Sequence, residues 1–184
     1  MSRYTPEEIE KAAEVTTGSY EELGRLPTPL FFSHCRTAFG DTIELIVNRP
    51  GTQEILLTQR SKEDPHFPGI WHIPGVMLAL EDKDGPYPDA IDNAALRVRD
   101  ELEGTVIASM LRLSPQWLHQ LPRISNRGGE ISTFYGAYLY EDEPKVGQMF
   151  DAHELPEPML ENHRDIADRA PEAIRQAHAS LPII

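Results

Sequence analysis

The segment between Gly75 and Gly104 constrains the fold of this chain more than any other part of its sequence. It begins with a glycine, crosses a polar loop at residues 82–88, and then carries the spacing of apolar residues that is typical of an amphipathic helix. Asp89 suits the N-cap of that helix, and Gly104 suits its end. The segment therefore predicts a loop, a helix that runs from Asp89 to Glu103, and a second loop.

The sequence on both sides of this segment predicts a strand pair before the helix and a hairpin and a helical tail after it. This order favours an α/β or α+β fold with a mixed sheet. A proline-rich loop is expected at residues 61–74, because its prolines would interrupt regular structure. In chain order, the expected elements are a helix at 6–15, strands at 43–47 and 54–60 with a turn at 49–52, a loop at 61–74, a hairpin of 117–124 with 130–140, and a helical tail at 159–180 that breaks near Pro171.

The length of 184 residues suits one folded domain. We expect an N-terminal helical arm over residues 1–28 and a domain over residues 29–184 that includes the C-terminal helix. Cys35 is the sole cysteine, so the chain can form no intrachain disulfide. No apolar run approaches the roughly 18 residues of a membrane span, so a cytoplasmic protein without a membrane partner is expected.

The net charge is −13, from 17 Lys and Arg residues against 30 Asp and Glu residues. Non-specific nucleic-acid binding relies on Lys and Arg that neutralise phosphates. The charge therefore predicts that nucleic acid is not a partner. An anionic small molecule remains compatible with it if a metal ion or a local arginine receives the anion.

Three blocks of the sequence resemble the Nudix family. The central block, from Gly75 to Gly104, resembles the Nudix box, G-x5-E-x7-R-E-U-x-E-E-x-G-U, where U is a bulky apolar residue. A strand that ends in Arg60 and a P-G-x-W-x-x-P-G run at residues 68–75 precede it, and residues 149–156 resemble the late W-F-x-x-D-E-L-P segment. The resemblance implies an α/β/α sandwich with a mixed β-sheet.

The same resemblance implies a chemistry and a set of residues. Family members hydrolyse a nucleoside diphosphate linked to another group and use Mg²⁺ or Mn²⁺ held by glutamates of the box. A nucleotide or diphosphate ligand is therefore implied, and a homodimer is a further expectation. The implied residues are Glu101 and Arg97 as catalytic, Glu101 and Glu81 as metal ligands, and Arg60, Trp71 and Gly75 as substrate-binding.

The chain departs from the box at the positions that carry its chemistry. Val98 and Leu102 stand where the family has glutamates, and they share one helical face with Ile91 and Ala95. Fifteen residues, instead of the family's seven, separate Glu81 from Arg97. The extra residues fall in a loop, where they cost little.

Two classes of function follow. One is a hydrolase whose catalytic competence depends on Glu101, and the other is a catalytically inactive module that keeps the fold and binds a nucleotide or regulates. In a second register, residues 97–104 also resemble isopentenyl diphosphate isomerases and GDP-mannose mannosyl hydrolases, and both would again make Glu101 the metal ligand. Further candidates are two loop histidines, His66 and His72, and three late glutamates, Glu130, Glu141 and Glu143.

Overall fold

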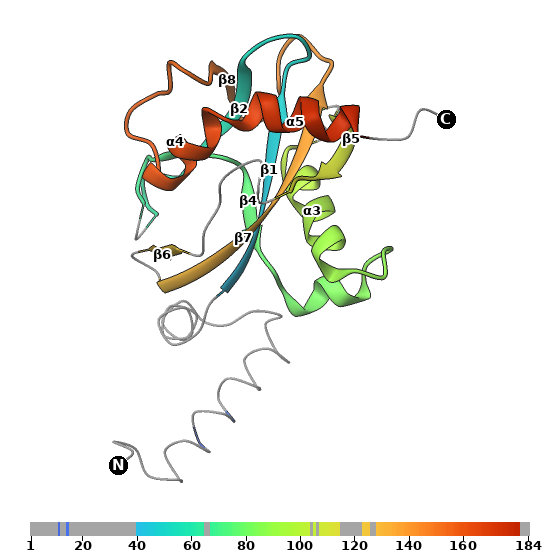
Figure 1. Cartoon of the computed structure of the whole chain (residues 1–184). Coiled ribbons are helices and arrows are strands. Elements are labelled where there is room, and N and C mark those ends of the chain that lie inside the picture. The colour runs from blue at the N-terminus through green and yellow to red at the C-terminus, as the bar shows by residue number, and fades with distance from the viewer. Residues whose placement is uncertain are drawn as a thin grey trace.

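The computed structural model describes residues 40–180 apart from 65–66, 104, 106, 115–122 and 126–127, together with Lys11 and Glu14 (Figure 1). Of the helix expected at residues 6–15, these two residues alone are described, and both are helical. The expected boundary between residues 28 and 29 lies outside the described part and stays a prediction.

The described elements within residues 40–180 are strands, one 3-10 helix and α-helices. They are β1 (Gly40–Asn48), β2 (Glu54–Gln59), β3 (Trp71–His72), β4 (Gly75–Met77), the 3-10 helix η1 (Leu80–Asp84), α3 (Ala90–Glu101), β5 (Ile107–Arg112), β6 (Arg123–Ser125), β7 (Gly128–Leu139), β8 (Gln148–Asp151), α4 (Glu161–Ala167) and α5 (Ala170–Ala179).

The strands form one mixed sheet with β1 at its centre. β1 pairs with β7 in parallel along its whole length, from Gly40 opposite Glu130 to Asn48 opposite Tyr138. On its other side, β1 pairs with β2 at one end and with β4 at the other, both antiparallel. The sheet therefore divides into two branches beside β1, with β2 and β3 on one branch and β4 on the other.

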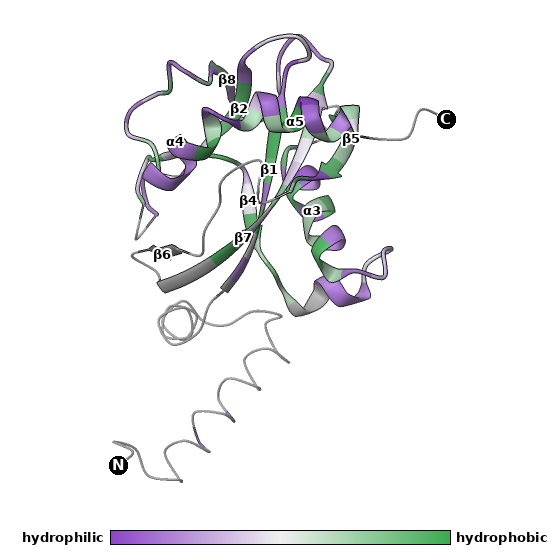
Figure 2. Ribbon diagram, in the orientation of Figure 1, coloured by the Kyte–Doolittle hydropathy of each residue, from purple (hydrophilic) through white to green (hydrophobic). Residues whose placement is uncertain are grey.

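Helices cover both faces of the sheet. Alternate residues of β1 point to opposite faces, as strand geometry requires. Ile43, Leu45 and Val47 are buried with the apolar side of α3, whereas Ile46 is buried with residues of α4 and α5. Figure 2 shows hydrophobic colouring along β1 and on parts of α3 and α5. The expected α/β/α sandwich with a mixed sheet is confirmed.

Helix α3 begins as the sequence predicts and ends earlier. The Asp89 side chain accepts a hydrogen bond from the Ile91 backbone N–H, which makes it the N-cap. The helix ends at Glu101 rather than Glu103. The Leu102 N–H bonds to the carbonyl three residues back, and Glu103 has a positive φ of 51°, which is incompatible with continuing a helix.

Asn93 of α3 anchors the polar loop that lengthens this region. Its Nδ2 donates to the carbonyls of Asp82 (2.7 Å) and Tyr87 (2.8 Å), and its Oδ1 accepts from the Tyr87 N–H (2.8 Å). The expectation of an irregular loop over residues 82–88 is wrong in its first part, because residues as far as Asp84 belong to η1.

Other predicted elements are confirmed with shifted limits. β1 and β2 fall on the expected strands, and the tail divides into α4 and α5 with Pro171 in the first turn of α5. β6 and β7 pair as a hairpin, and residues 117–122 of its expected first strand lie outside the described part. The loop expected at residues 61–74 contains β3, because Trp71 and His72 pair with Gln59 and Thr58 of β2. Among the described residues, no helix has the length and apolarity to cross a membrane.

Candidate functional site

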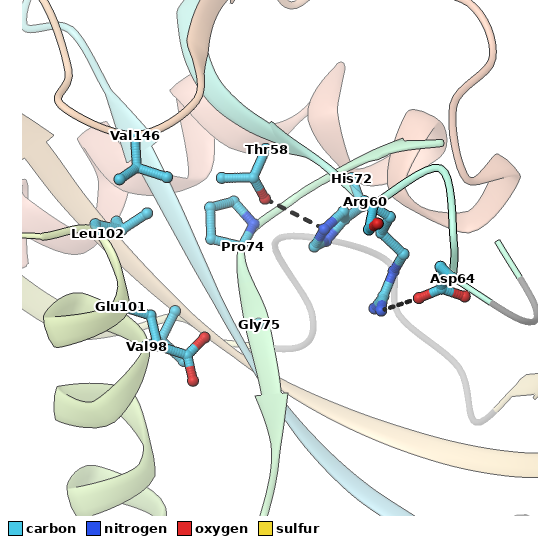
Figure 3. A pocket seen from close by; sticks show the side chains of 11 residues that line it. Thr58, Arg60, Asp64, His72, Pro74, Gly75, Val98, Glu101, Leu102 and Val146 are labelled. Carbon is cyan, nitrogen blue, oxygen red and sulfur yellow. Dashed lines mark hydrogen bonds and ion pairs between the residues drawn. The ribbon is translucent and has the colours of Figure 1, made fainter. Parts of the chain in front are cut away.

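A cleft of about 320 Å³ opens where the two branches of the sheet meet the C-terminal end of α3. Its lining residues come from four segments of the sequence. They are Thr58, Arg60, Ser61, Asp64, His72, Pro74, Gly75, Val98, Glu101, Leu102 and Val146. Four of the candidate site residues from the sequence, Arg60, His72, Gly75 and Glu101, therefore share one cavity. In Figure 3, the Glu101 carboxylate lies on the α3 side and the Arg60 guanidinium on the other, with Gly75 of β4 between them.

Arg60 supplies the positive charge of the cleft. Its Nη1 donates to Oδ2 of Asp64 at 3.2 Å, and its guanidinium carbon lies 5.9 Å from the centre of the Phe67 ring. Asp64 is itself held by the Phe67 N–H at 2.8 Å. These contacts fix the arginine within its loop. Its Nε is buried and has no hydrogen-bond partner among the described residues.

Glu101 is the carboxylate that α3 presents to the cleft. As a residue it is exposed, but desolvation of its carboxyl group raises its pKa, and the nearby positive charge of Arg97 opposes that rise. A carboxylate at the rim of a cleft is suited to contact a cation or a proton.

Val98 and Leu102 form the apolar wall beside Glu101. Val98 is 0% exposed and Leu102 is 2% exposed, and both belong to the core cluster between α3 and β1. The expectation that the apolar stripe of the helix extends over these two positions is confirmed. The face where the family has carboxylates is thus part of the hydrophobic core.

Arg97 does not line the cleft; it binds the segment before α3. Its Nε and Nη2 donate to the two carboxylate oxygens of Asp82 at 3.1 and 2.9 Å, and Nη2 also donates to the Met77 carbonyl at 2.8 Å. Asp82 is only 4% exposed and also accepts from the Ala79 N–H. Arg97 therefore connects α3 to both η1 and β4, and its charge acts on Glu101 from outside the cleft.

Gly75 lines the cleft with backbone alone. It lies opposite Glu44 of β1, and a β-carbon at this position would be 1.8 Å from the Glu44 Oε2 atom and 2.9 Å from the Ile43 carbonyl oxygen. The Glu44 carboxylate thus occupies the space that a side chain at position 75 would need.

Trp71 lies outside the lining of the cleft. Its ring meets the Phe150 ring edge-on, with centroids 4.9 Å apart, and it packs against the core cluster on the α4 and α5 face. Its backbone N–H donates to the Pro158 carbonyl, and its carbonyl accepts from the Leu160 N–H. These contacts hold β3 against the segment that leads into α4.

The described residues do not fit a metal ion held by the protein alone. Among them, no group of three or more His, Cys, Asp or Glu side chains is placed to hold one. Glu101 and Asp64 are the carboxylates in the lining, and Asp64 is bound to Arg60. Glu81 lies in η1, but its side chain is outside the described part. Mg²⁺ is often bound by one or two carboxylates together with substrate phosphates. This donor set therefore suits a metal ion that arrives with a diphosphate.

Several lining residues could not be picked out from the sequence. Thr58 faces the cleft because it pairs with His72 across β2 and β3. Asp64 joins it because it binds Arg60 four residues earlier. Val146 precedes β8, a strand that the sequence did not predict. The spacing of Arg60 and Asp64 was the one available signal, and in a loop such a spacing carries little information.

The fold and the cleft together define the class of protein, which is an α/β/α sandwich with a mixed sheet and a site beside one helix. The structure is similar to that of a MutT Nudix hydrolase from Burkholderia pseudomallei, with a TM-score of 0.50 and 21% identity, covering 72% of this chain and 98% of that one. It is also similar to a MutT/Nudix family protein from Enterococcus faecalis, with a TM-score of 0.53 and 18% identity, covering 90% of this chain and 74% of that one.

A third similar structure is a Nudix hydrolase from Alicyclobacillus acidocaldarius, with a TM-score of 0.50 and 14% identity, covering 80% of this chain and 98% of that one. No protein-family model matches the sequence, and no curated protein matches it. The chain has the Nudix fold, so the fold that the three sequence blocks predict is confirmed.

The net charge predicted that nucleic acid is not a partner, and this prediction is wrong. A matching structure is NrtR from Shewanella oneidensis complexed with a 27mer DNA, with a TM-score of 0.48 and 18% identity, covering 73% of this chain and 62% of that one. Net charge reports the whole surface and not a local patch, so it does not exclude that class of partner.

Proposed function

We propose that this chain is a Nudix-type hydrolase that cleaves a nucleoside diphosphate linked to another group, within the cleft between α3 and the two branches of the sheet. The observation that carries the proposal is the meeting of Arg60, Gly75 and Glu101 in one cavity from three distant segments. The Arg60 guanidinium and the Glu101 carboxylate lie on opposite sides of the cleft, with the Gly75 backbone between them. This arrangement suits a diphosphate that carries a metal ion.

Each of these residues has a defined role in the proposal. The guanidinium of Arg60 binds a phosphate, for which its planar set of donors is suited. Gly75 contributes backbone atoms to the wall that faces the substrate. Glu101, with Glu81 as the second carboxylate, contacts the Mg²⁺ or Mn²⁺ ion of a metal–diphosphate substrate.

Arg97 and Trp71 act indirectly in this proposal. Arg97 holds α3 against η1 through Asp82 and thereby positions Glu101. Trp71 anchors β3 through Phe150 and so positions the strand that carries His72. Neither residue is proposed to touch the reacting phosphorus.

The buried Val98 and Leu102 imply an atypical and slow enzyme. They remove two carboxylates that would otherwise share the charge of the metal ion. Electrostatic stabilisation is usually the largest contribution to such a reaction. We therefore expect turnover below the median enzyme value of about 10 s⁻¹.

The test incubates the protein with ADP-ribose, UDP-glucose, diadenosine tetraphosphate or ATP and with Mg²⁺ or Mn²⁺. Hydrolysis is measured as the release of phosphate products. Turnover that Glu101→Gln lowers by about 100-fold or more supports the proposal. Asp100→Asn serves as the matched control, because Asp100 is an exposed carboxylate on the same helix and does not line the cleft.

Two results would contradict the proposal. One is no turnover of any compound, combined with thermal stabilisation by a nucleotide that needs no metal ion; that result indicates a binding module. The other is turnover that Glu101→Gln leaves unchanged. Glu81→Gln tests the second carboxylate separately, since its loss should raise the metal concentration needed for half-maximal rate.

A further inference from the structure

The imidazole of His72 is built into the wall of the cleft opposite α3. The pairing of β2 with β3 places His72 directly across from Thr58, and both side chains line the cavity. The distance between His72 Nε2 and Thr58 Oγ1 is 3.2 Å, and Figure 3 marks this contact with a dashed line.

The backbone of Ile73 determines which nitrogen of His72 carries the proton. Nδ1 of His72 lies 2.7 Å from the Ile73 carbonyl oxygen, which can only accept a hydrogen bond. Nδ1 is therefore protonated, and in the neutral ring the lone pair belongs to Nε2. That lone pair faces the Thr58 hydroxyl, which can donate to it.

A second histidine holds the same residue from the other side. The Ile73 N–H donates to Nδ1 of His163 at 2.9 Å, and His163 Nε2 lies 3.7 Å from Oε1 of Glu44. His163 is 5% exposed and Glu44 is 7% exposed, so this arrangement is inside the protein. Both backbone polar groups of Ile73 are thus engaged by histidines, and the orientation of His72 is fixed.

The proposed hydrolysis needs a group that accepts a proton from water. On α3, the positions of Val98 and Leu102 offer none, and Glu101 is committed in the proposed function to the metal ion of the substrate. Asp64 accepts from both Arg60 and the Phe67 N–H. Histidine is the side chain whose ordinary pKa lies close to neutral pH, where a general base works best.

We propose that His72 is the general base of the cleft and that Thr58 relays the proton to it. The oxygen of a water molecule forms a bond to phosphorus, and the bridging P–O bond to the leaving phosphate breaks. The Thr58 hydroxyl receives the proton of the water as it gives its own proton to Nε2 of His72. The inference rests on the proposed function, because it assigns a proton acceptor to that reaction.

The charged groups around His72 determine the pH at which it can act. On the segment after β2 these are the Arg60 guanidinium and the Asp64 carboxylate, on α3 the Glu101 carboxylate, and on α4 the His163 ring, whose centroid is 6.2 Å from that of His72. A general base must be unprotonated to act, so the rate is expected to fall on the acid side.

The experiment measures kcat, KM and the pH–rate profile of wild type and variants. The substrate is whichever of ADP-ribose, UDP-glucose, diadenosine tetraphosphate and ATP wild type cleaves fastest. His72→Gln should lower kcat by about 100-fold or more with little change in KM, and should abolish the acid limb. Added imidazole should restore part of the rate of His72→Ala. Thr58→Val should lower kcat, whereas Thr58→Ser, which keeps the hydroxyl, should retain most of it.

His153→Gln is the matched control. His153 is exposed, its Nδ1 lies 2.9 Å from Oδ1 of Asp168, and it does not line the cleft, so its loss should change neither kcat nor the profile. Melting temperatures within a few degrees of wild type establish that each variant is folded.

The outcomes separate this inference from the proposed function. If wild type and His72→Gln share the same kcat and pH profile while Glu101→Gln is inactive, His72 is not the base and the hydrolase proposal stands. A second combination of results also overturns the inference. In it, imidazole does not restore the activity that His72→Ala loses, and the pH–rate profile of His72→Gln keeps the acid limb of wild type. If wild type cleaves no compound of the panel, the proposed function fails and the general base fails with it.

Discussion

At the scale of single residues, Gly75 shows how an absent side chain shapes the cleft. The Glu44 carboxylate fills the space beside Gly75, where a β-carbon would lie 1.8 Å from Oε2. Glycine is therefore required by the packing of β4 on β1. The sequence singles out Gly75, but it gives no reason to connect it with Glu44, because the two residues meet only through the register of the sheet.

Gly75→Ala is expected to lower the free energy of unfolding by about 1–3 kcal/mol, the usual cost of overpacking. Urea denaturation of wild type and variant measures this loss. In a Glu44→Ala background the same substitution should cost less, because the nearest obstacle has been removed. Equal costs in both backgrounds would show that Glu44 is not the source of the strain.

Glu101→Gln should stabilise the folded protein slightly at neutral pH. Desolvation raises the pKa of Glu101, so its charged form is less favourable in the folded state than in the unfolded state. The gain should be present above the raised pKa and should disappear as the pH falls below the ordinary value. Solvent screening keeps it under about 1 kcal/mol. Melting temperatures of both proteins between pH 4 and pH 8 measure it, and a variant less stable than wild type at pH 7 would contradict it.

At the scale of elements, α3 combines a core face with a cleft face. Its N-cap and its apolar stripe could be predicted from Asp89 and from the spacing of apolar residues, because both are local properties of the chain. Its end could not be placed, since the positive φ of Glu103 has no signature in the sequence. β3 and β4 could not be predicted either. Each has two or three residues, too few for a period, and their partners are distant in the sequence.

Val98→Glu and Leu102→Glu should each lower the free energy of unfolding by about 3–5 kcal/mol, because each places an uncompensated charge in the core. Chemical denaturation is the measurement. Arg99→Glu introduces the same side chain on a more exposed part of the helix, and because the ion pair that it loses with Asp100 is exposed, its cost should stay within about 1 kcal/mol. Unchanged stability in the two core variants would place these positions in a solvated cleft, and Mg²⁺ binding should then be measured.

Asn93→Ala tests how η1 and the loop after it are attached to α3. The substitution removes three hydrogen bonds from a side chain that is 5% exposed. Buried groups left without partners make the expected loss about 1–3 kcal/mol. Hydrogen exchange at the Tyr87 amide should accelerate more than exchange in β1. Equal acceleration at both sites would mean that the loop opens only with the whole domain.

At the scale of the whole molecule, the sheet brings distant segments to one cleft while the surface stays strongly acidic. The fold could be predicted because three sequence blocks resemble one family in the correct order. The cleft could be predicted only in part: Arg60, Gly75 and Glu101 follow from that resemblance, whereas Thr58 and Val146 depend on strand pairing and on the path of a loop. Residues that meet through tertiary structure leave no pattern in a single sequence.

The net charge of −13 predicts that moderate salt stabilises the protein. Excess negative charge repels itself in the compact state, and the screening length falls from about 30 Å at 0.01 M salt to about 8 Å at 0.15 M. Salt also weakens surface ion pairs such as Arg49–Glu54 and Arg175–Glu172. Each exposed pair contributes at most about 1 kcal/mol and many contribute nothing, so the repulsion should dominate.

Raising NaCl from 10 to 150 mM should therefore increase the free energy of unfolding by about 1 kcal/mol, or roughly 2–4 °C in Tm for a domain of this size. Calorimetry in NaCl and in choline chloride at equal ionic strength measures the effect and separates screening from specific binding of sodium. A lower Tm in 150 mM salt would mean that attractive pairs outweigh the repulsion. The same acidic surface opposes the approach of a free diphosphate, which favours a substrate whose charge a metal ion has already reduced.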